Sequence, residues 1–298
     1  MKRLIALLLT VAFSQPATAK LSVFACEPEW GALAKELGGN ALRIYTATTG
    51  KQDPHHIQAR PSLLAKARRA DLLVCTGAEL EIGWLPILLR KTGNPRIQPG
   101  RLGHFMATDY VRLRDIPTYL DRSEGDIHAA GNPHIQTDPH NIARVAKVLA
   151  QRLVELDSAN AADYQNRYQN FKKRWQAAIR RWEKRATVLK GVPIVVHHKN
   201  WIYLEHWLGL KEIATLEPKP GIPPSSWHLA RVLKQLKRQP AKMVIYTAYQ
   251  DSRPARWLSQ KAEIPAVVLP FTVGGTTEAT NLFTLFDDTL KRLREAIK

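Results

Sequence analysis

Histidines stand at three points where a loop or a strand end meets the next element of the chain. His55 and His134 each follow a proline directly, and His198 follows a short apolar run, residues 193–196. A preceding proline fixes the approach of the backbone, so less entropy is lost when a loop histidine is held in one direction. A lone histidine in such a place is more often a packing or capping residue. Three neutral imidazoles from separate elements, however, suit Zn²⁺ in tetrahedral geometry, and we predict that they form one metal site.

The elements that must position these histidines alternate along the chain. Apolar runs alternate with amphipathic stretches, which predicts a strand–helix alternation. In such sheets, ligands gather at the carboxyl ends of the strands. The predicted strands are residues 21–26, 42–47, 71–75, 193–196, 243–247 and 266–269, and the main predicted helices are residues 29–37, 60–69, 80–90, 138–156 and 281–297.

Residues 158–189 form a long run of helix formers with no interior glycine or proline. As one helix it would be roughly 45 Å long at about 1.5 Å per residue. The predicted fold is therefore α/β, with two lobes, each a parallel-type sheet flanked by helices and each with its own core, joined by one long backbone helix. The first lobe is expected over residues 20–157 and the second over residues 190–298. Two of the three histidines fall in the first lobe, so a bound metal would lie between the lobes.

The N-terminus has the pattern of a secretory leader. Lys2 and Arg3 form a basic start, residues 4–13 an apolar stretch, and residues 17–19 a small-residue cleavage site. The apolar stretch is about half of the roughly 20 residues that a membrane-spanning helix needs. We expect a signal peptide over residues 1–19, cleaved near Ala19, and a mature protein in the periplasm.

The formal charge of +18 raises the question of nucleic acid or an anionic surface. The basic residues are spread along helical stretches such as residues 171–190, where they alternate with Trp175, Ile179 and Trp182 at core-like spacing. A solvated helix face is the favoured interpretation, and no nucleic-acid partner is expected. An exported adhesion or nucleic-acid-binding protein is the weakest of the functional classes considered.

Cys26 and Cys75 each end an apolar run that is predicted to be a strand. If the two strands are neighbours in one parallel sheet, the sulfur atoms come within reach of a disulfide, which an oxidising compartment would favour. Two buried free thiols are an equal alternative.

Five segments resemble, in the same order and over nearly the whole mature chain, the zinc and manganese solute-binding proteins of ABC importers. They are residues 53–55, 132–134, 138–139, 198–204 and 207–210. The resemblance implies two α/β lobes, a long helix that limits hinge opening, and a metal held in the cleft by His55, His134 and His198. It also implies delivery of the metal to a membrane permease, and we expect the protein to act as a monomer.

The imidazole at His198 bears on metal choice, because manganese-type members of this family commonly carry a carboxylate there and carboxylate oxygens suit harder ions. Three nitrogen ligands predict Zn²⁺. Cu²⁺ and Ni²⁺ would also bind such a site by the Irving–Williams order, and they are less expected, as is Mn²⁺.

The fourth ligand is where the sequence departs from the family. Many relatives place an aspartate before a proline near the last strand, and Leu269 stands there in this chain. The candidates to replace it are His128, Glu217, Asp251 or a water molecule, and we rank His128 and water above the two carboxylates. His128 lies six residues before His134 on a glycine-bounded loop, from which it could fold over the ion.

Other side chains are expected to orient the ligands. A histidine that binds a metal usually donates its second ring N–H to a carboxylate or carbonyl, and Asp138 and Glu81 are the predicted acceptors. His56 and His197 neighbour proposed ligands but should point to the opposite face of an extended backbone. We leave both outside the ligand set, with His56 as a substitute for His55.

An exported zinc hydrolase is the alternative function, because three histidines with an open fourth position also describe a catalytic zinc site. Glu217 or Asp251 would have to serve as the general base. The sequence contains no His-Glu-x-x-His run and no motif that places a nucleophile beside a base, so we predict a binding protein and not an enzyme.

Overall fold

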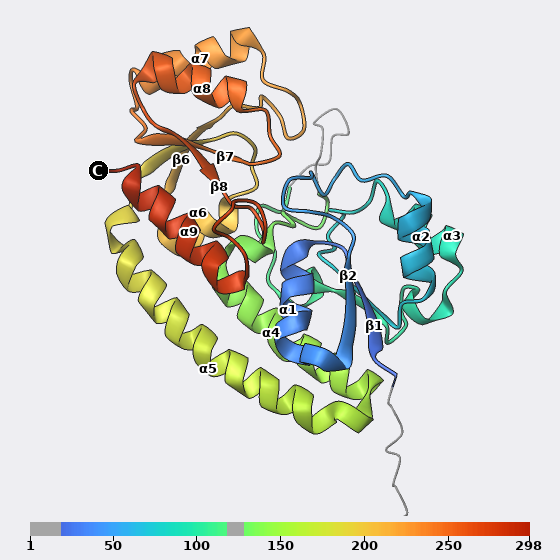
Figure 1. The fold of residues 1–298 in the computed structure, drawn as a ribbon. Coiled ribbons are helices and arrows are strands. Elements are labelled where there is room, and N and C mark those ends of the chain that lie inside the picture. The colour runs from blue at the N-terminus through green and yellow to red at the C-terminus, as the bar shows by residue number, and fades with distance from the viewer. Residues whose placement is uncertain (1–18, 118–127) are drawn as a thin grey trace, which may run out of the picture.

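A computed structural model describes residues 19–117 and 128–298, which form two α/β lobes (Figure 1). The predicted leader lies outside the described residues, except for Ala19. Among the helices of the described part, none combines the length and the apolar character that crossing a membrane requires.

The first lobe is built on a four-stranded sheet in the order β2-β1-β3-β4, and all its pairings are parallel. Its strands are β1 (Leu21–Ala25), β2 (Leu42–Thr46), β3 (Leu72–Cys75) and β4 (His104–Met106), and its helices are α1 (Pro28–Gly38), α2 (Pro61–Arg68), α3 (Leu85–Thr92) and α4 (Pro139–Leu156). Strand β3 is buried along its whole length, as a central strand of a parallel sheet must be.

The second lobe repeats this architecture with a parallel sheet in the order β6-β5-β7-β8. Its strands are β5 (Pro193–Val196), β6 (Lys211–Thr215), β7 (Met243–Thr247) and β8 (Ala266–Leu269), and its helices are α6 (Ile202–Leu208), α7 (Ser226–Leu236), α8 (Ser252–Ala262) and α9 (Leu282–Glu295).

Helix α5 (Ala161–Ala186) runs along both lobes (Figure 1). A short 3₁₀ turn adjoins each of its ends, so the helical stretch covers the predicted residues 158–189. Its buried aromatic side chains face the core, whereas most of its lysines and arginines face outward. This pattern is the solvated basic face that the sequence predicted.

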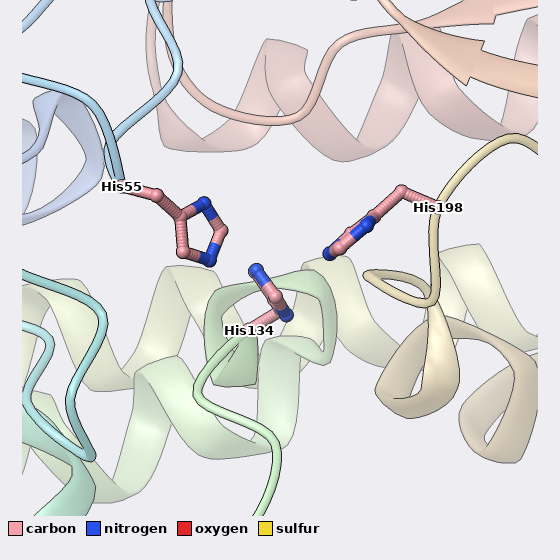
Figure 2. A group of neighbouring side chains, drawn as sticks. All are labelled: His55, His134 and His198. Carbon is pink, nitrogen blue, oxygen red and sulfur yellow. The ribbon is translucent and has the colours of Figure 1, made fainter. Parts of the chain in front are cut away.

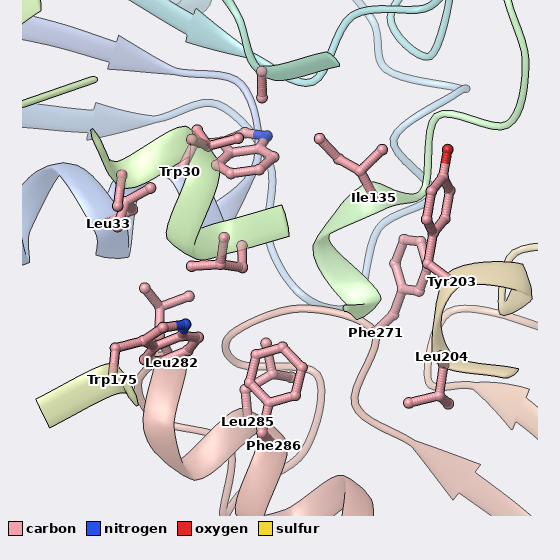
Figure 3. Close-up of a cluster of buried hydrophobic side chains, with 14 of the residues drawn as sticks. Trp30, Leu33, Ile135, Trp175, Tyr203, Leu204, Phe271, Leu282, Leu285 and Phe286 are labelled. Carbon is pink, nitrogen blue, oxygen red and sulfur yellow. The ribbon is translucent and has the colours of Figure 1, made fainter. Parts of the chain in front are cut away.

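The largest hydrophobic cluster extends through both lobes, so the expectation of one separate core for each lobe was wrong. Trp175 of α5 is fully buried, and its ring packs edge-to-face against Phe283 and Phe286 of α9 (Figure 3). Trp30 of the first lobe belongs to the same cluster. Smaller clusters lie on the outer side of each sheet. The two lobes therefore share a core on the side of α5, whereas α2, α3, α7 and α8 lie on the opposite sides of the sheets.

Three local predictions were wrong. Strands β4 and β6 were not predicted, because β4 has only three residues and β6 is a mixed edge strand with little buried surface. The helix predicted from residue 80 begins only at Leu85. Residues 80–84 form turns, and Trp84, directly before the helix, has a φ of −140°, which lies outside the helical range.

A disulfide joins Cys26, which follows β1, to Cys75 at the end of β3. The two strands are neighbours, with Ala25 paired to Val74, and the two cysteine Cα atoms are 4.8 Å apart. Of the two alternatives that the sequence left open, the structure has the disulfide, and both residues are fully buried.

The lobes also meet where the loop after β8 touches the first lobe. Thr272 donates its hydroxyl to the carboxylate of Glu29, in the first turn of α1, and both residues are buried. Nearby, a Cβ on Gly50 would lie 2.4 Å from backbone atoms of Gly274 and Gly275. A side chain at residue 50 would therefore force this contact between the lobes apart.

Burial raises the pKa of Glu29 from 4.5 to about 7, although its bond from Thr272 works in the opposite direction. The folded protein therefore holds this proton more tightly than the unfolded chain does. The resulting stabilisation is present below pH 4.5 and is lost as pH rises through 7. The free energy of unfolding should fall by on the order of 3 kcal/mol over this range.

Glu29→Gln should therefore flatten this part of the pH profile, because a glutamine amide oxygen still accepts from Thr272 but does not titrate. Urea unfolding of both proteins at pH 5 and at pH 7.5 measures the difference. Since the histidines titrate in both proteins, the subtraction removes their contribution and leaves that of Glu29 and of the carboxyl groups coupled to it. An equal pH dependence in the two proteins would contradict the assignment.

Candidate metal centre

The structure brings His55, His134 and His198 together between the lobes (Figure 2). His55 lies in the loop that leads from β2 to α2, His134 just before the turn that opens α4, and His198 two residues after the end of β5. Two of the three therefore follow the carboxyl ends of parallel strands, where the sequence placed them.

One ring nitrogen from each of the three histidines lies within 4.8 Å of the other two. Ring centroids are 5.4 Å apart for His55 and His134, 5.9 Å for His55 and His198, and 5.8 Å for His134 and His198. His134 is completely buried, and His198 is 7% exposed. The group is thus a compact cluster of imidazoles screened from bulk water.

His55 and His134 are oriented by the same local motif. Asp53 Oδ1 accepts from the backbone N–H of His55 and bonds its ring Nδ1 at 2.7 Å. Asn132 Oδ1 likewise accepts from the backbone N–H of His134 and lies 2.8 Å from its ring Nδ1. In both cases a proline separates the acceptor from the histidine. Because Nδ1 is occupied, each ring presents Nε2 to the centre.

His198 reaches the same arrangement through a more distant residue. Its Nδ1 bonds Glu217 Oε2 at 2.6 Å, and because a carboxylate can only accept, Nδ1 carries the proton. The same oxygen accepts from the backbone N–H of Gly221, which fixes the carboxylate in the loop after β6. All three imidazoles are therefore held in the tautomer that leaves Nε2 unprotonated.

The surroundings of His134 keep its ring neutral. Burial and then the neighbouring imidazoles hold the pKa of His134 well below 6.5. Burial would raise the pKa of Asp53, but its hydrogen bonds from His55 and the charge of that ring outweigh this effect and lower it. His134 Nε2 is buried and has no hydrogen-bond partner among the described residues. An unprotonated, unpartnered nitrogen in this position is an open ligand atom.

His128 lies at the edge of this group. Its Nε2 is 3.3 Å from Nε2 of His55, and its ring centroid is 5.3 Å from that of His55 and 6.0 Å from that of His134. Burial, followed by the charges of His55 and His198, lowers the pKa of His128 to about 3. Of the candidate side chains for the fourth coordination position, His128 is the one that brings a nitrogen close to Nε2 of a proposed ligand.

The carboxylate candidates have other contacts. Glu217 orients His198, as described above, and Asp251 caps α8 and pairs with Arg253 at the surface. Leu269 is buried at the end of β8, and the ring of Phe271 packs edge-on against that of His134 at 5.4 Å. An apolar wall therefore lies on the side of His134 next to β8.

The predicted acceptors Asp138 and Glu81 were wrong, because each is committed to a different group. Asp138 caps α4 and bonds His140, and Glu81 accepts from the backbone amides that follow β3. The acceptors are Asp53, Asn132 and Glu217 instead. Asp53 and Asn132 stand two residues before their histidines, a spacing that could have revealed them in the sequence.

His128, His134 and His198 line a cavity of about 390 Å³ between the lobes. The first lobe contributes Asp115, Pro117, His128, Asn132 and His134, and the second lobe His198, Lys199, Thr215 and residues 217–220. Both lobes therefore supply the walls of one cleft, as the positions of the three histidines in the sequence required.

A family model described as zinc-uptake complex component A, periplasmic, matches residues 23–296. The chain belongs to this family. The predicted resemblance is thereby confirmed. Members of the zinc-uptake component family are solute-binding components of metal importers and not enzymes, which confirms the prediction of a binding protein.

Two curated relatives show how widely this family varies. The zinc-binding lipoprotein AdcA of Streptococcus pneumoniae is 24% identical over 273 residues, 88% of this chain and 52% of that protein. The chain thus spans about half the length of this relative. The manganese ABC transporter substrate-binding lipoprotein PsaA, also from Streptococcus pneumoniae, is 22% identical over 87% of this chain and 82% of its own. Relatives of both metal types therefore occur.

The crystal structure of ZnuA is similar over 94% of this chain and all of its own, with a TM-score of 0.78 and 18% sequence identity. At this identity the likeness concerns the fold. It confirms the prediction of two parallel-sheet lobes flanked by helices and linked by one long helix.

Proposed function

We propose that this protein captures Zn²⁺ in the cleft between its lobes and delivers it to the membrane permease of an ABC importer. The observation that carries the proposal is the convergence of three imidazoles, each with Nδ1 hydrogen-bonded and Nε2 turned inward. His55, His134 and His198 are the proposed ligands. Family membership supports the transport role, and the periplasm is the proposed location of a mature, monomeric protein.

His128 is the proposed fourth ligand. Two nitrogens on one tetrahedral zinc ion lie about 3.3 Å apart, given Zn–N bonds of about 2.0–2.1 Å. The Nε2 atoms of His55 and His128 have this spacing, at 3.3 Å. Leu269 supplies no oxygen ligand, so the proposed coordination shell contains nitrogen alone.

Such a shell favours Zn²⁺ over Mn²⁺, because imidazole suits zinc, copper and nickel, whereas manganese prefers oxygen ligands. Cu²⁺ and Ni²⁺ would bind in the test tube, and metal availability would select among these ions in the cell. Calorimetric titration should give one Zn²⁺ per chain and much weaker binding of Mn²⁺. Equal affinity for both ions would refute the proposed selectivity.

A zinc hydrolase has no support from the site. The two carboxylates that would serve as its general base are engaged, Glu217 with His198 and Gly221, and Asp251 with Arg253. The relatives named above are zinc- and manganese-binding proteins and give this alternative no support.

Glu217→Ala is expected to weaken zinc binding by about 10–100-fold, the usual effect of removing the partner that orients a metal-binding histidine. Without the carboxylate, the ring of His198 can rotate and its Nδ1 can lose the proton. Glu217→Gln should recover part of the affinity, because its amide oxygen can still accept from Nδ1.

Competition titration with a zinc chelator measures these affinities. Asp251→Asn is the matched control, since it removes another carboxylate of the second lobe while an asparagine can still cap α8. If Glu217→Ala bound zinc as tightly as this control, the orienting role would be wrong.

A further inference from the structure

A second group of metal-ligating atoms lies in the first lobe, apart from the histidines. The sulfur atoms of Cys26 and Cys75 and a carboxylate oxygen of Glu81 are all within 4.8 Å of one another. Both cysteines are fully buried, and Glu81 is 2% exposed. In the oxidised protein the two sulfurs are bonded to each other, so this group has no free thiolate.

A further carboxyl group is buried next to this group. Glu27, which directly follows Cys26, is 3% exposed, and its Oε1 is buried without a hydrogen-bond partner among the described residues. A buried carboxyl with an unpartnered oxygen beside two sulfurs is an unusual feature, because buried polar atoms are normally satisfied.

We propose that reduction of the Cys26–Cys75 disulfide creates a second metal site, in which the two thiolates and Glu81 bind a soft or borderline divalent ion such as Cd²⁺ or Zn²⁺. Glu27, whose Oε1 is buried and unpartnered among the described residues, is the proposed further oxygen ligand. This site is independent of the histidine cluster and of the proposed transport function.

The chemistry balances with a dithiol or a phosphine as the reductant. A dithiol transfers two electrons and two protons to the disulfide, which yields two thiols and the oxidised, cyclic disulfide of the reductant. A phosphine supplies the two electrons and is oxidised to the phosphine oxide, with one water molecule giving the oxygen atom and the two protons. The two thiols then bind one M²⁺ and release two protons, because a metal binds the thiolate and not the thiol. The soft sulfur ligands select zinc, cadmium or copper(I) over magnesium or calcium.

The sheet holds the two sulfurs in place after the bond is broken. Cys26 and Cys75 sit at equivalent positions of neighbouring parallel strands, with their Cα atoms 4.8 Å apart. On one tetrahedral zinc ion, two sulfurs with Zn–S bonds of about 2.3 Å lie about 3.8 Å apart. Side chains that project from backbones at this spacing can span that distance without a change of strand register. Glu81 is likewise held, since its oxygens accept from the backbone amides of Thr76 and Gly77.

Cadmium binding to His134→Ala protein tests the proposal, because that variant disables the histidine site and leaves the thiol site unaltered. One sample is oxidised, and the other is prepared and kept under a phosphine reductant, with its thiols counted after denaturation. The reduced sample should contain two thiols and bind one Cd²⁺ with an ultraviolet cadmium–thiolate band. Cd²⁺ should raise its melting temperature. The oxidised sample should show neither the band nor the shift.

Two further variants in the same background separate the ligands. Cys75→Ser should lose the band, and Glu81→Gln should weaken Cd²⁺ binding by about tenfold or more while both thiols remain. The proposal is overturned if the reduced sample binds no Cd²⁺, binds it without the thiolate band, or remains unfolded when Cd²⁺ is added. It is also overturned if Cys75→Ser binds as the parent does, or if two thiols cannot be obtained. None of these outcomes bears on the histidine site.

Discussion

His134→Ala is expected to lower the affinity for Zn²⁺ by more than the roughly 10–100-fold that loss of an orienting partner causes. His134 is completely buried, and its Nε2 has no other hydrogen-bond partner among the described residues. The ring is backed by Phe271 and anchored by Asn132, so its Nε2 is held in one position before a metal binds. The variant should therefore lose most of the zinc-induced rise in melting temperature, which reports binding to the native state.

Thermal unfolding with and without a fixed excess of Zn²⁺ measures this loss. His206→Ala is the matched control, because His206 is an exposed histidine of the second lobe that bonds Arg114 outside the cluster. The control should keep the full zinc-induced shift. Equal shifts in both variants would mean that zinc binds at a site other than the one proposed.

Removal of the disulfide, by alanine at both Cys26 and Cys75, should lower the free energy of unfolding by about 4 kcal/mol. The bond closes a loop between residues 49 positions apart, and in the chain-entropy account such a loop restricts the unfolded chain by about this amount. Both side chains are buried, so alanine also removes two sulfur atoms from the outer core of the first lobe.

Urea denaturation at equilibrium measures the change, and the unaltered protein kept under a reductant is the control. The reduced control should lose a similar amount of stability, because it has lost the same constraint but retains the sulfur atoms. A difference below about 1 kcal/mol between the oxidised protein and the double variant would contradict this account of the disulfide.

Six strands were predictable from sequence because each is a short, largely apolar run bounded by a turn. Strands β5, β7 and β8 have the predicted boundaries, and β1, β2 and β3 differ by one residue at most. Strands β4 and β6 escaped prediction, since β4 has only three residues and β6 has no buried residue and begins with two charged ones. Their pairing depends on neighbouring strands that are distant in sequence, and no local pattern records it.

One short sequence motif orients two of the proposed ligands and also a histidine outside the site. An Asp or Asn followed by Pro and His occurs three times, and all three copies make the same two hydrogen bonds from the histidine to the first residue. Two copies direct His55 and His134 into the cleft. The third places His140 at the start of α4, where its Nε2 meets Glu183. The motif therefore predicts how the ring is oriented relative to its own backbone. Which groups contact the ring depends on the tertiary fold.

The acceptor of His198 could not be predicted in the same way. Glu217 lies 19 residues beyond His198, in the loop after an edge strand that the sequence did not indicate. Its role depends on the parallel pairing of β5 with β6, which brings the ends of the two strands together. His128 was predicted from its distance to His134 along the chain, and its approach to His55 became visible only in three dimensions.

X-ray absorption at the zinc edge, on protein loaded with one equivalent of Zn²⁺ and with its disulfide intact, identifies the atoms that bind the metal. We expect a shell of nitrogen atoms at about 2.0–2.1 Å, with the multiple scattering that three or four imidazole rings produce. In His128→Ala protein the shell should contain one imidazole fewer, with a non-imidazole ligand such as water in its place. A shell that contains sulfur at about 2.3 Å, or one made mainly of carboxylate oxygen, would contradict the histidine site.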